Sequence, residues 1–263
     1  MSRRGVPSPP PGQRTTTLDE ARRLVRFPIR TPTVLGPPEQ ALLADLLRFF
    51  QVGRVADAAV AAFDVGPGST VAVSSRSGII SWAAGRSVVV GAAVSRGSIC
   101  SPDGLDLDSL TALKRAGRSV AEAGEGRSDT PEAVVEIPCD IWIPAARPDV
   151  IRADNVDRLD ARLVLQGANI PCTEDAEARL HERGILCLPD FIANAGGVIC
   201  AACEYAGMDR EAAFAAISSR IRANTLEVLN AARDGDMLPR QAALVMARRR
   251  VLEAMATRRW SVF

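Results

Sequence analysis

Residues 163–197 read LVLQGANIPCTEDAEARLHERGILCLPDFIANAGG, and this stretch repeats one pattern. A short apolar run occupies residues 163–165, and a second occupies residues 185–188. The polar segment between them, residues 173–183, has the spacing of apolar and charged side chains that is typical of a helix. Strand, helix and strand in this order predict a parallel β-α-β unit.

Small residues and an asparagine follow each of the two apolar runs. Gly167, Ala168 and Asn169 come after the first, and Asn194 lies between small residues after the second. In parallel sheets, ligands bind at the carboxyl ends of the strands, where small residues let a ligand approach the backbone. We therefore predict a ligand-binding edge at these two strand ends. The alternative is that both asparagines only satisfy the backbone of ordinary turns.

The rest of the sequence extends this unit into a larger sheet. Further strands are expected near residues 70, 88 and 141, with mostly helical segments between them. This alternation predicts an α/β fold with a Rossmann-like, doubly wound, mostly parallel sheet. The last quarter predicts a helical carboxyl-terminal segment, with one helix over about 209–233 and another that starts at Pro239.

The composition along the chain predicts three segments. Residues 1–16 are rich in proline, arginine and threonine and are expected to form a disordered tail. Residues 17–65 are expected to be a helical remnant or linker, and residues 66–263 a Rossmann-like nucleotide-binding domain that includes the carboxyl-terminal helices. Neither a signal peptide nor a membrane span is expected, so we predict a cytoplasmic protein.

The charge balance argues against two classes of partner. The 263 residues carry a net charge of only +1, which is not the electrostatic footprint of a protein that binds nucleic acid or a membrane surface. Arginine clusters at 248–250 and 258–259 are interpreted as solvated helix faces. We therefore expect neither a nucleic-acid nor a membrane partner.

Few residue types are available for amine, imidazole or thiol chemistry. Lys114 is the only lysine and His181 the only histidine, the latter expected on the surface at the end of a helix. The six cysteines include one Cys-x-x-Cys pair, Cys200 and Cys203, inside an apolar stretch that predicts buried helix packing. A zinc site normally needs four ligands, and the other cysteines supply no second pair, so no metal is expected.

Three motifs occur in order between about residues 102 and 204, and together they are specific. They are Pro144-Ala145-Ala146, the run GANIPCT at 167–173, and the run NAGG at 194–197, which follows Pro189-Asp190. In this order and spacing they resemble the glutamate, leucine, phenylalanine and valine dehydrogenase family, and most of all its glutamate branch.

The resemblance implies the nucleotide-binding half of an oxidoreductase that catalyses the reversible oxidative deamination of an amino acid. The implied cofactor is NAD or NADP, with Asn169 and Asn194 at its nicotinamide end. Carboxamides can hydrogen-bond both ribose hydroxyls and the nicotinamide carboxamide, which agrees with this role. The expected cofactor-binding residues are Ala145, Ala146, Gly167, Ala168, Asn169 and Asn194.

The sequence departs from the family around its first strand. Ser75, Ser77 and Ile80 occupy the three positions where the family carries the glycines of a phosphate-binding turn. Arg96 lies where an acidic residue would hold the ribose hydroxyls, which favours the 2′-phosphate of NADP. The first β-α-β unit is therefore expected to be eroded.

The family's catalytic lysine and aspartate lie on a separate amino-terminal domain, and residues 1–70 contain no lysine. We assign no catalytic residue and expect a truncated, degenerate member with little or no activity alone. One alternative is a non-catalytic subunit that assembles with a full-length paralogue, or with copies of itself. Another is a binding module for a smaller adenosine nucleotide.

Overall fold

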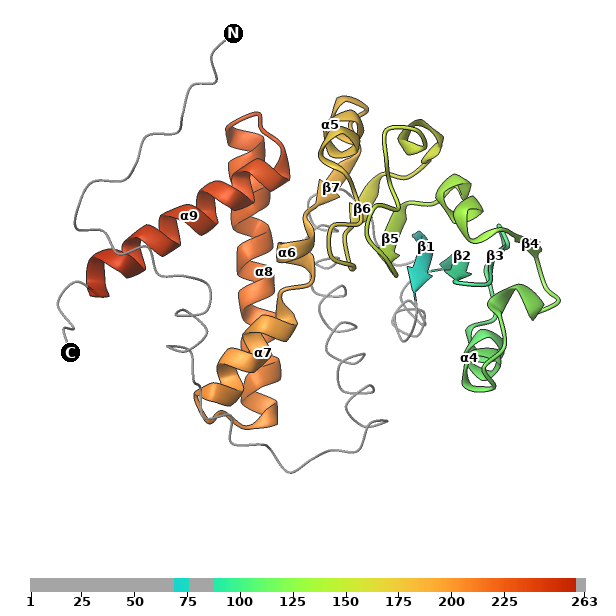
Figure 1. The fold of residues 1–263 in the computed structure, drawn as a ribbon, viewed down its shortest axis with the longest axis horizontal. Coiled ribbons are helices and arrows are strands. Elements are labelled where there is room, and N and C mark those ends of the chain that lie inside the picture. The colour runs from blue at the N-terminus through green and yellow to red at the C-terminus, as the bar shows by residue number, and fades with distance from the viewer. Residues whose placement is uncertain (1–68, 76–87, 259–263) are drawn as a thin grey trace, which may run out of the picture. The chain divides into compact units, whose positions relative to one another are not determined.

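The computed structural model describes residues 69–75 and 88–258, all within one compact unit of the chain. Its centre is a seven-stranded sheet with the order β4-β3-β2-β1-β5-β6-β7 (Figure 1). The strands are β1 (Thr70–Ser75), β2 (Val88–Val94), β3 (Gly97–Cys100), β4 (Arg127–Asp129), β5 (Ile141–Ala145), β6 (Leu163–Leu165) and β7 (Leu186–Leu188).

Strands β2, β1, β5, β6 and β7 are neighbours in this order and run parallel. This arrangement confirms the predicted α/β class and the mostly parallel sheet. All five strands predicted from the sequence are present. The predicted tail at 1–16, the segment 17–65, and Ser77 and Ile80 lie outside the described residues.

The two strands that the sequence did not predict form an antiparallel edge. The chain turns at Ser95 and Arg96, and β3 then pairs with β2, while β4 pairs with β3. Gly97 has a φ of 148°, a conformation that favours glycine and permits this abrupt return. Strand β4 has three residues, all of them exposed. Both strands are too short and too polar to show a strand pattern in the sequence.

Helices cover both faces of the sheet, as a doubly wound fold requires. The 3-10 helices are η1 (Val120–Glu122), η2 (Pro131–Glu136) and η3 (Val156–Arg158). The α-helices are α4 (Leu107–Arg115), α5 (Glu174–Glu182), α6 (Asp190–Ala193), α7 (Gly196–Tyr205), α8 (Arg210–Asp234) and α9 (Pro239–Arg258). No helix among the described residues is both long enough and apolar enough to cross a membrane.

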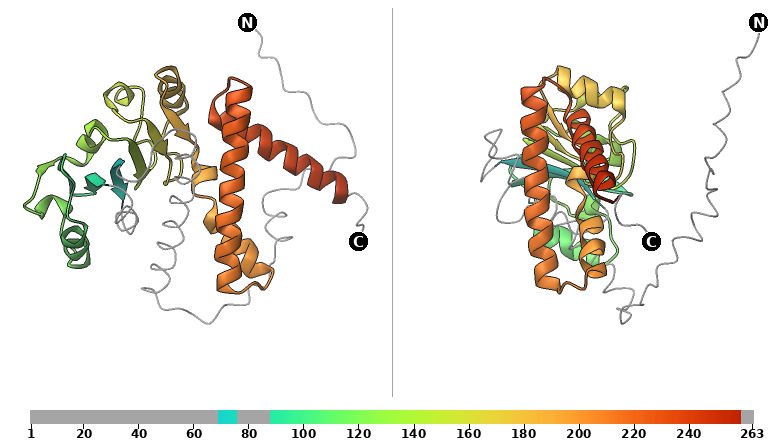
Figure 2. Two further views of the ribbon diagram at one scale, coloured as in Figure 1. Left: turned by 180° about the vertical axis from the view of Figure 1, so that it is seen from behind. Right: turned by 90° about the vertical axis from the view of Figure 1, so that its left-hand side faces the viewer.

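Alternate side chains of the strands enter two separate cores. Val73, Ile143 and Leu165 point to the face covered by α7 and α8, where Ile217 packs against them. Trp142 and its neighbours point to the opposite face, covered by α5, η2 and η3. Figures 1 and 2 show helices α7 to α9 gathered beside the β7 end of the sheet.

Polar side chains cap the starts of two of the predicted helical segments. The hydroxyl of Thr173 accepts a hydrogen bond from Ala176 N at the start of α5, and the carboxylate of Asp209 accepts one from Ala212 N at the start of α8. Helix α9 begins at Pro239, as predicted. Short polar side chains are preferred at these positions because they satisfy backbone N–H groups that have no partner within the helix.

We expect Trp142→Ala to lower the free energy of unfolding by about 3–5 kcal/mol, because the fully buried ring fills the core under β5. Its indole N–H donates to the carbonyl oxygen of Val134 at 3.0 Å. Trp142→Phe should cost less, about 1–3 kcal/mol, because it mainly removes that donor. Urea titrations followed by circular dichroism test this order, and equal losses for both variants would contradict it.

Candidate nucleotide-binding edge

The carboxyl ends of the central strands bring three of the predicted residues together. Ser75 of β1 lies opposite Ala145 of β5 in the parallel register. Ala168 N donates to Pro144 O at 2.8 Å. A Cβ atom added to Gly167 would lie only 3.0 Å from the Cβ atom of Ala145. The small residues at the ends of β5 and β6 therefore let the chain segments that follow these strands lie directly against each other.

The two predicted asparagines are in direct contact. Asn194 Nδ2 donates to Asn169 Oδ1 at 2.7 Å, and a longer bond of 3.4 Å reaches the carbonyl oxygen of Ala168. One detail of the prediction was wrong, because Asn194 does not leave a strand directly. The four-residue helix α6 follows β7, and Asn194 is the residue that ends it. The sequence did not reveal α6 because a single helical turn has no periodicity to detect.

Asp190, at the start of α6, is bonded to both asparagine segments. Its Oδ2 atom accepts a hydrogen bond from the backbone N–H of Ile170 at 2.9 Å, directly after Asn169. Its backbone carbonyl oxygen accepts one from Asn194 N at 2.7 Å. Ile170 has a φ of 47°, which is unfavourable for a β-branched residue and must be held by its surroundings.

The partly buried guanidinium of Arg240 contacts the carboxylate of Asp190. Arg240 of α9 donates through Nε and Nη2 to the two carboxylate oxygens of Glu177, both at 2.6 Å. The same Nη2 atom lies 3.1 Å from Asp190 Oδ1 and 3.1 Å from Gln166 Oε1. These hydrogen bonds, those of Glu177 above all, raise the pKa of Arg240. One cation thus joins residues from α5, α6, α9 and the segment after β6.

Two thiols lie beside this ion pair. The Sγ atoms of Cys172 and Cys187 and the carboxylate of Glu177 lie within 4.8 Å of one another, which is close enough for three ligands of a metal ion. The carboxylate is already bonded to Arg240 through both oxygens, so the guanidinium takes the place a cation would need. The contact with Cys187 and burial raise the pKa of the Cys172 thiol.

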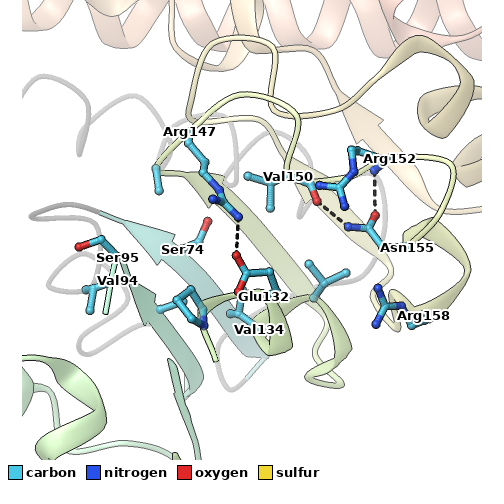
Figure 3. A pocket seen from close by; sticks show the side chains of 14 residues that line it. Ser74, Val94, Ser95, Glu132, Val134, Arg147, Val150, Arg152, Asn155 and Arg158 are labelled. Carbon is cyan, nitrogen blue, oxygen red and sulfur yellow. Dashed lines mark hydrogen bonds and ion pairs between the residues drawn. The ribbon is translucent and has the colours of Figure 1, made fainter. Parts of the chain in front are cut away.

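A cavity of about 260 Å³ opens at the carboxyl ends of β1, β2 and β5 (Figure 3). Its walls come from the ends of these strands, from η2 and from the loop after β5. The lining residues are Ser74, Ala93, Val94, Ser95, Pro131, Glu132, Val134, Val135, Ala146, Arg147, Val150, Arg152, Asn155 and Arg158. Among the predicted cofactor-binding residues, Ala146 lines this cavity.

Each arginine of the cavity forms an ion pair with a carboxylate. Arg147 Nη2 lies 2.8 Å from Glu132 Oε1, as Figure 3 shows, and this contact is the main reason that the pKa of Glu132 lies below its usual value. Arg152 pairs with Asp154 at 3.0 Å. Because these side chains are about half exposed, the pairs contribute little to stability, and their guanidinium groups remain accessible to an anion.

Ser74 supplies a polar group without a partner. Its side chain is only 6% exposed, and its hydroxyl has no hydrogen-bond partner among the described residues. A buried hydroxyl of this kind is costly unless something satisfies it. Since Ser74 lines the cavity, a ligand bound there can supply the missing bond.

Arg96, which the sequence offered as the contact to a 2′-phosphate, does not line the cavity. Its guanidinium donates to the carbonyl oxygen of Gly117, away from the strand ends. The arginines of the cavity are Arg147, Arg152 and Arg158, and none of them was predicted from the sequence. The position of Arg147, directly after the Pro144-Ala145-Ala146 motif, was a signal that could have revealed it.

A second cavity of about 420 Å³ lies between α5, β7 and the adjoining ends of α8 and α9. Its walls are mostly apolar, and the exposed His181 lies at one side. None of the predicted cofactor-binding residues lines it. His181 is thus a surface residue near the end of α5, as the sequence predicted.

The strand order, the helices on both faces and the small-residue strand ends define a Rossmann-type α/β domain. The chain belongs to the glutamate/leucine/phenylalanine/valine dehydrogenase family, whose model matches residues 52–259. This finding confirms the resemblance noted in the sequence.

Relatives and solved structures agree with this assignment. The chain is 34% identical over 209 residues to glutamate dehydrogenase of Aeropyrum pernix, covering 73% of this chain and 50% of the relative. It is 34% identical over 211 residues to an NADP(+)-dependent glutamate dehydrogenase of Pyrobaculum calidifontis, with the same coverage of 73% and 50%. The chain thus spans about half the length of these relatives.

The fold is similar to that of hetero-hexameric glutamate dehydrogenase from Thermus thermophilus, with a TM-score of 0.71 and 23% identity. This match covers 83% of the present chain and 54% of the other. The fold also resembles that of L-tryptophan dehydrogenase from Nostoc punctiforme, with a TM-score of 0.61 at 20% identity over 92% of this chain and 66% of that one.

Asn169→Ala should lower the free energy of unfolding by less than about 1 kcal/mol, because its exposed carboxamide is bonded only to Asn194. Asn155→Ala is the control. Asn155 is buried, accepts from Arg152 N and donates to Val150 O, both at 2.8 Å, so its loss should cost about 1–3 kcal/mol. Urea titration compares the two. A loss at Asn169 as large as that at Asn155 would favour the alternative that the asparagines serve only the fold.

Proposed function

We propose that this chain binds NADP along the carboxyl edge of its parallel sheet and supplies the cofactor half of an amino-acid dehydrogenase. The adenosine half of the cofactor lies in the cavity at the ends of β1, β2 and β5. The nicotinamide half lies against the pair formed by Asn169 and Asn194. When bound, this cofactor supplies a hydride acceptor for the oxidation of an amino acid.

The observation that carries the proposal is the combination of a cavity at the sheet's carboxyl edge with the unpartnered hydroxyl of Ser74 inside it. Doubly wound sheets bind nucleotides at this edge. Ser74 directly precedes the residue where the phosphate-binding turn is expected, so a ribose or phosphate oxygen is a suitable partner for its hydroxyl.

The charges of the cavity support NADP over NAD. A dinucleotide without the 2′-phosphate is usually held by a carboxylate after the second strand, whereas an arginine nearby accommodates the phosphate. The residues at the end of β2 are Val94 and Ser95, and neither is a carboxylate. Arg147 and Arg152 face the cavity from the loop after β5 (Figure 3). Two of the similar proteins are named for NADP, from Saccharolobus shibatae and Pyrobaculum calidifontis.

The proposed reaction class is reversible oxidative deamination, with glutamate as the substrate favoured by the relatives' names. We propose that the chain has little or no activity by itself. Deamination needs a base and an activated water besides the hydride acceptor. Lys114, the single lysine, belongs to α4, which follows β3 near one end of the strand order, whereas Asn169 and Asn194 follow β6 and β7 at the other end.

Calorimetric titration with NADP and NAD tests the cofactor. We expect Arg147→Ala and Arg152→Ala each to weaken NADP binding about tenfold and to leave NAD binding within about twofold, because one charge-assisted contact to the 2′-phosphate is lost. Arg179→Ala is the control, since Arg179 pairs with Asp157 and Glu182 outside the cavity. Equal losses for both cofactors would contradict the assignment of the phosphate, and no binding of either by the folded protein would contradict the function.

A second candidate function is that of a subunit that assembles with a complete paralogue, and the surface of α9 favours it. The buried side chains of this helix are Ala242, Ala243 and Met246, which pack against Val228 of α8. The opposite face of α9 is apolar as well. Its large exposed side chains, each more than half exposed, are Leu244, Val245, Val251, Leu252 and Met255.

A helix that is apolar on two opposite faces is usually buried on both. The chain also spans about half the length of its relatives, so a partner with the remaining half could cover this face. The many arginines of α9 would repel a second copy and favour a partner with carboxylates around an apolar face.

Leu244→Glu with Leu252→Glu should abolish association through the outward face of α9, because charges would replace its apolar contacts. Analytical ultracentrifugation of the chain mixed with a purified complete glutamate dehydrogenase measures whether the two proteins form a complex. The double variant Arg220→Gln and Arg222→Gln on α8 lowers the net charge by the same two units and serves as the control. Absence of a complex with the unmodified chain would contradict this second candidate, and a self-associating chain would favour the homo-oligomer.

A further inference from the structure

A chain of polar contacts connects Arg240 of α9 to the asparagine pair through Asp190 and the backbone of Ile170, and we call it the relay. Arg240 of α9 holds Oδ1 of Asp190 at 3.1 Å, and Oδ2 of the same carboxylate holds the backbone N–H of Ile170 at 2.9 Å. Ile170 directly follows Asn169. The backbone oxygen of Asp190 also binds the N–H of Asn194 at 2.7 Å. One carboxylate residue therefore sets the positions of both asparagine segments.

Asp190 is not needed to neutralise the charge of Arg240. Arg240 already forms a two-bond ion pair with Glu177, which neutralises both groups. Asp190 is a second buried carboxylate on the same cation and is only 7% exposed. Burying an extra carboxylate is unfavourable unless its hydrogen bonds are good, and both of its oxygens are used here. One of these two bonds goes to the strained loop that carries Asn169.

The conformation of that loop needs an external constraint. Ile170 adopts a φ of 47° and leaves its side chain 60% exposed, so neither backbone preference nor packing of its side chain explains the geometry. Asp149 N donates to Ile170 O at 2.9 Å and fixes the other side of the same residue. Backbone strain of this kind persists when surrounding contacts hold it, and here they orient a carboxamide.

We propose that Asp190 and Arg240 are positioning residues for the nicotinamide half of the cofactor, acting through the backbone of Ile170 on the Asn169–Asn194 pair. No hydrogen bond joins Arg240 to either asparagine. The lining of the cavity proposed for the adenosine half contains none of Asp190, Arg240, Asn169 and Asn194. The inference rests on the proposed function for its ligand, and on the relay itself for its geometry.

Two variants separate this role from a general one in folding. Asp190→Asn keeps the size of the side chain but replaces one acceptor oxygen by an NH2 donor, which then faces either the N–H of Ile170 or the guanidinium of Arg240. Arg240→Lys keeps the charge but replaces a planar fork of donors by one ammonium, which cannot satisfy Glu177 and Asp190 together. Arg250→Lys is the matched control on α9, because Arg250 pairs with Glu227 at the surface.

The ligand measurement compares NADP with adenosine 2′,5′-bisphosphate, which carries only the adenosine half. We expect Asp190→Asn and Arg240→Lys to weaken NADP about tenfold and to leave the bisphosphate within about twofold, while Arg250→Lys changes neither. If both ligands weaken alike, the residues act on the fold as a whole and the proposal fails. If neither weakens, the relay does not position the cofactor, and the proposal fails as well.

A measurement without ligand keeps this inference separate from the proposed function. Hydrogen exchange resolved to single amides should show faster exchange of the Ile170 N–H in Arg240→Lys, with the amides of β6 unchanged. An unaltered Ile170 in that variant would overturn the relay even if the chain binds NADP. Conversely, faster exchange in a chain that binds neither ligand would preserve the relay and contradict the cofactor assignment.

Discussion

The partly buried guanidinium of Arg240 is the interaction on which the arrangement of α5, α6 and α9 depends. It brings Glu177 of α5, Gln166 after β6 and Asp190 of α6 to one point, and it does so from the first turn of α9. The central carbon of this guanidinium lies over the ring of Phe191, 5.5 Å from the ring centre. Two buried carboxylates are tolerated beside one cation only when they are well hydrogen-bonded, and here Nε and Nη2 of Arg240 bond to both of them.

This constraint links the packing of the helices to the geometry of the sheet edge. The small residues after β5 and β6 allow close approach, but they do not by themselves orient a side chain. Orientation comes from Asp190, which binds the segments of both asparagines. At the other end of the edge, the cavity is built differently, from a loop with half-exposed arginines and an unpartnered serine. In the proposed function, one half of the cofactor meets the hydrogen-bonded asparagine pair and the other half meets these half-exposed arginines.

The sequence predicted what depends on local pattern and missed what depends on distant contacts. The five parallel strands, the capped starts of α5 and α8 and the start of α9 at Pro239 all follow from apolar runs and from residues with strong local preferences. The antiparallel strands β3 and β4 were missed because they have only four and three residues, and α6 because one turn has no period. Contacts between residues 50 or more positions apart, such as Arg240 with Asp190, leave no local trace. For the same reason, the sequence pointed to Arg96 and not to Arg147, since only the folded chain shows which arginines line the cavity.

The short strand β4 has a consequence for how copies of this chain meet. It exposes three residues, Arg127, Ser128 and Asp129, at the outer edge of the sheet. An open edge invites another strand to pair with it, and a brief, charged edge strand discourages this. At the opposite edge, α9 lies against β7 and covers it. Neither margin of the sheet therefore offers a long row of free backbone groups. Within the described part of the chain, strand pairing between copies is therefore disfavoured, which leaves the surfaces of the helices for specific association.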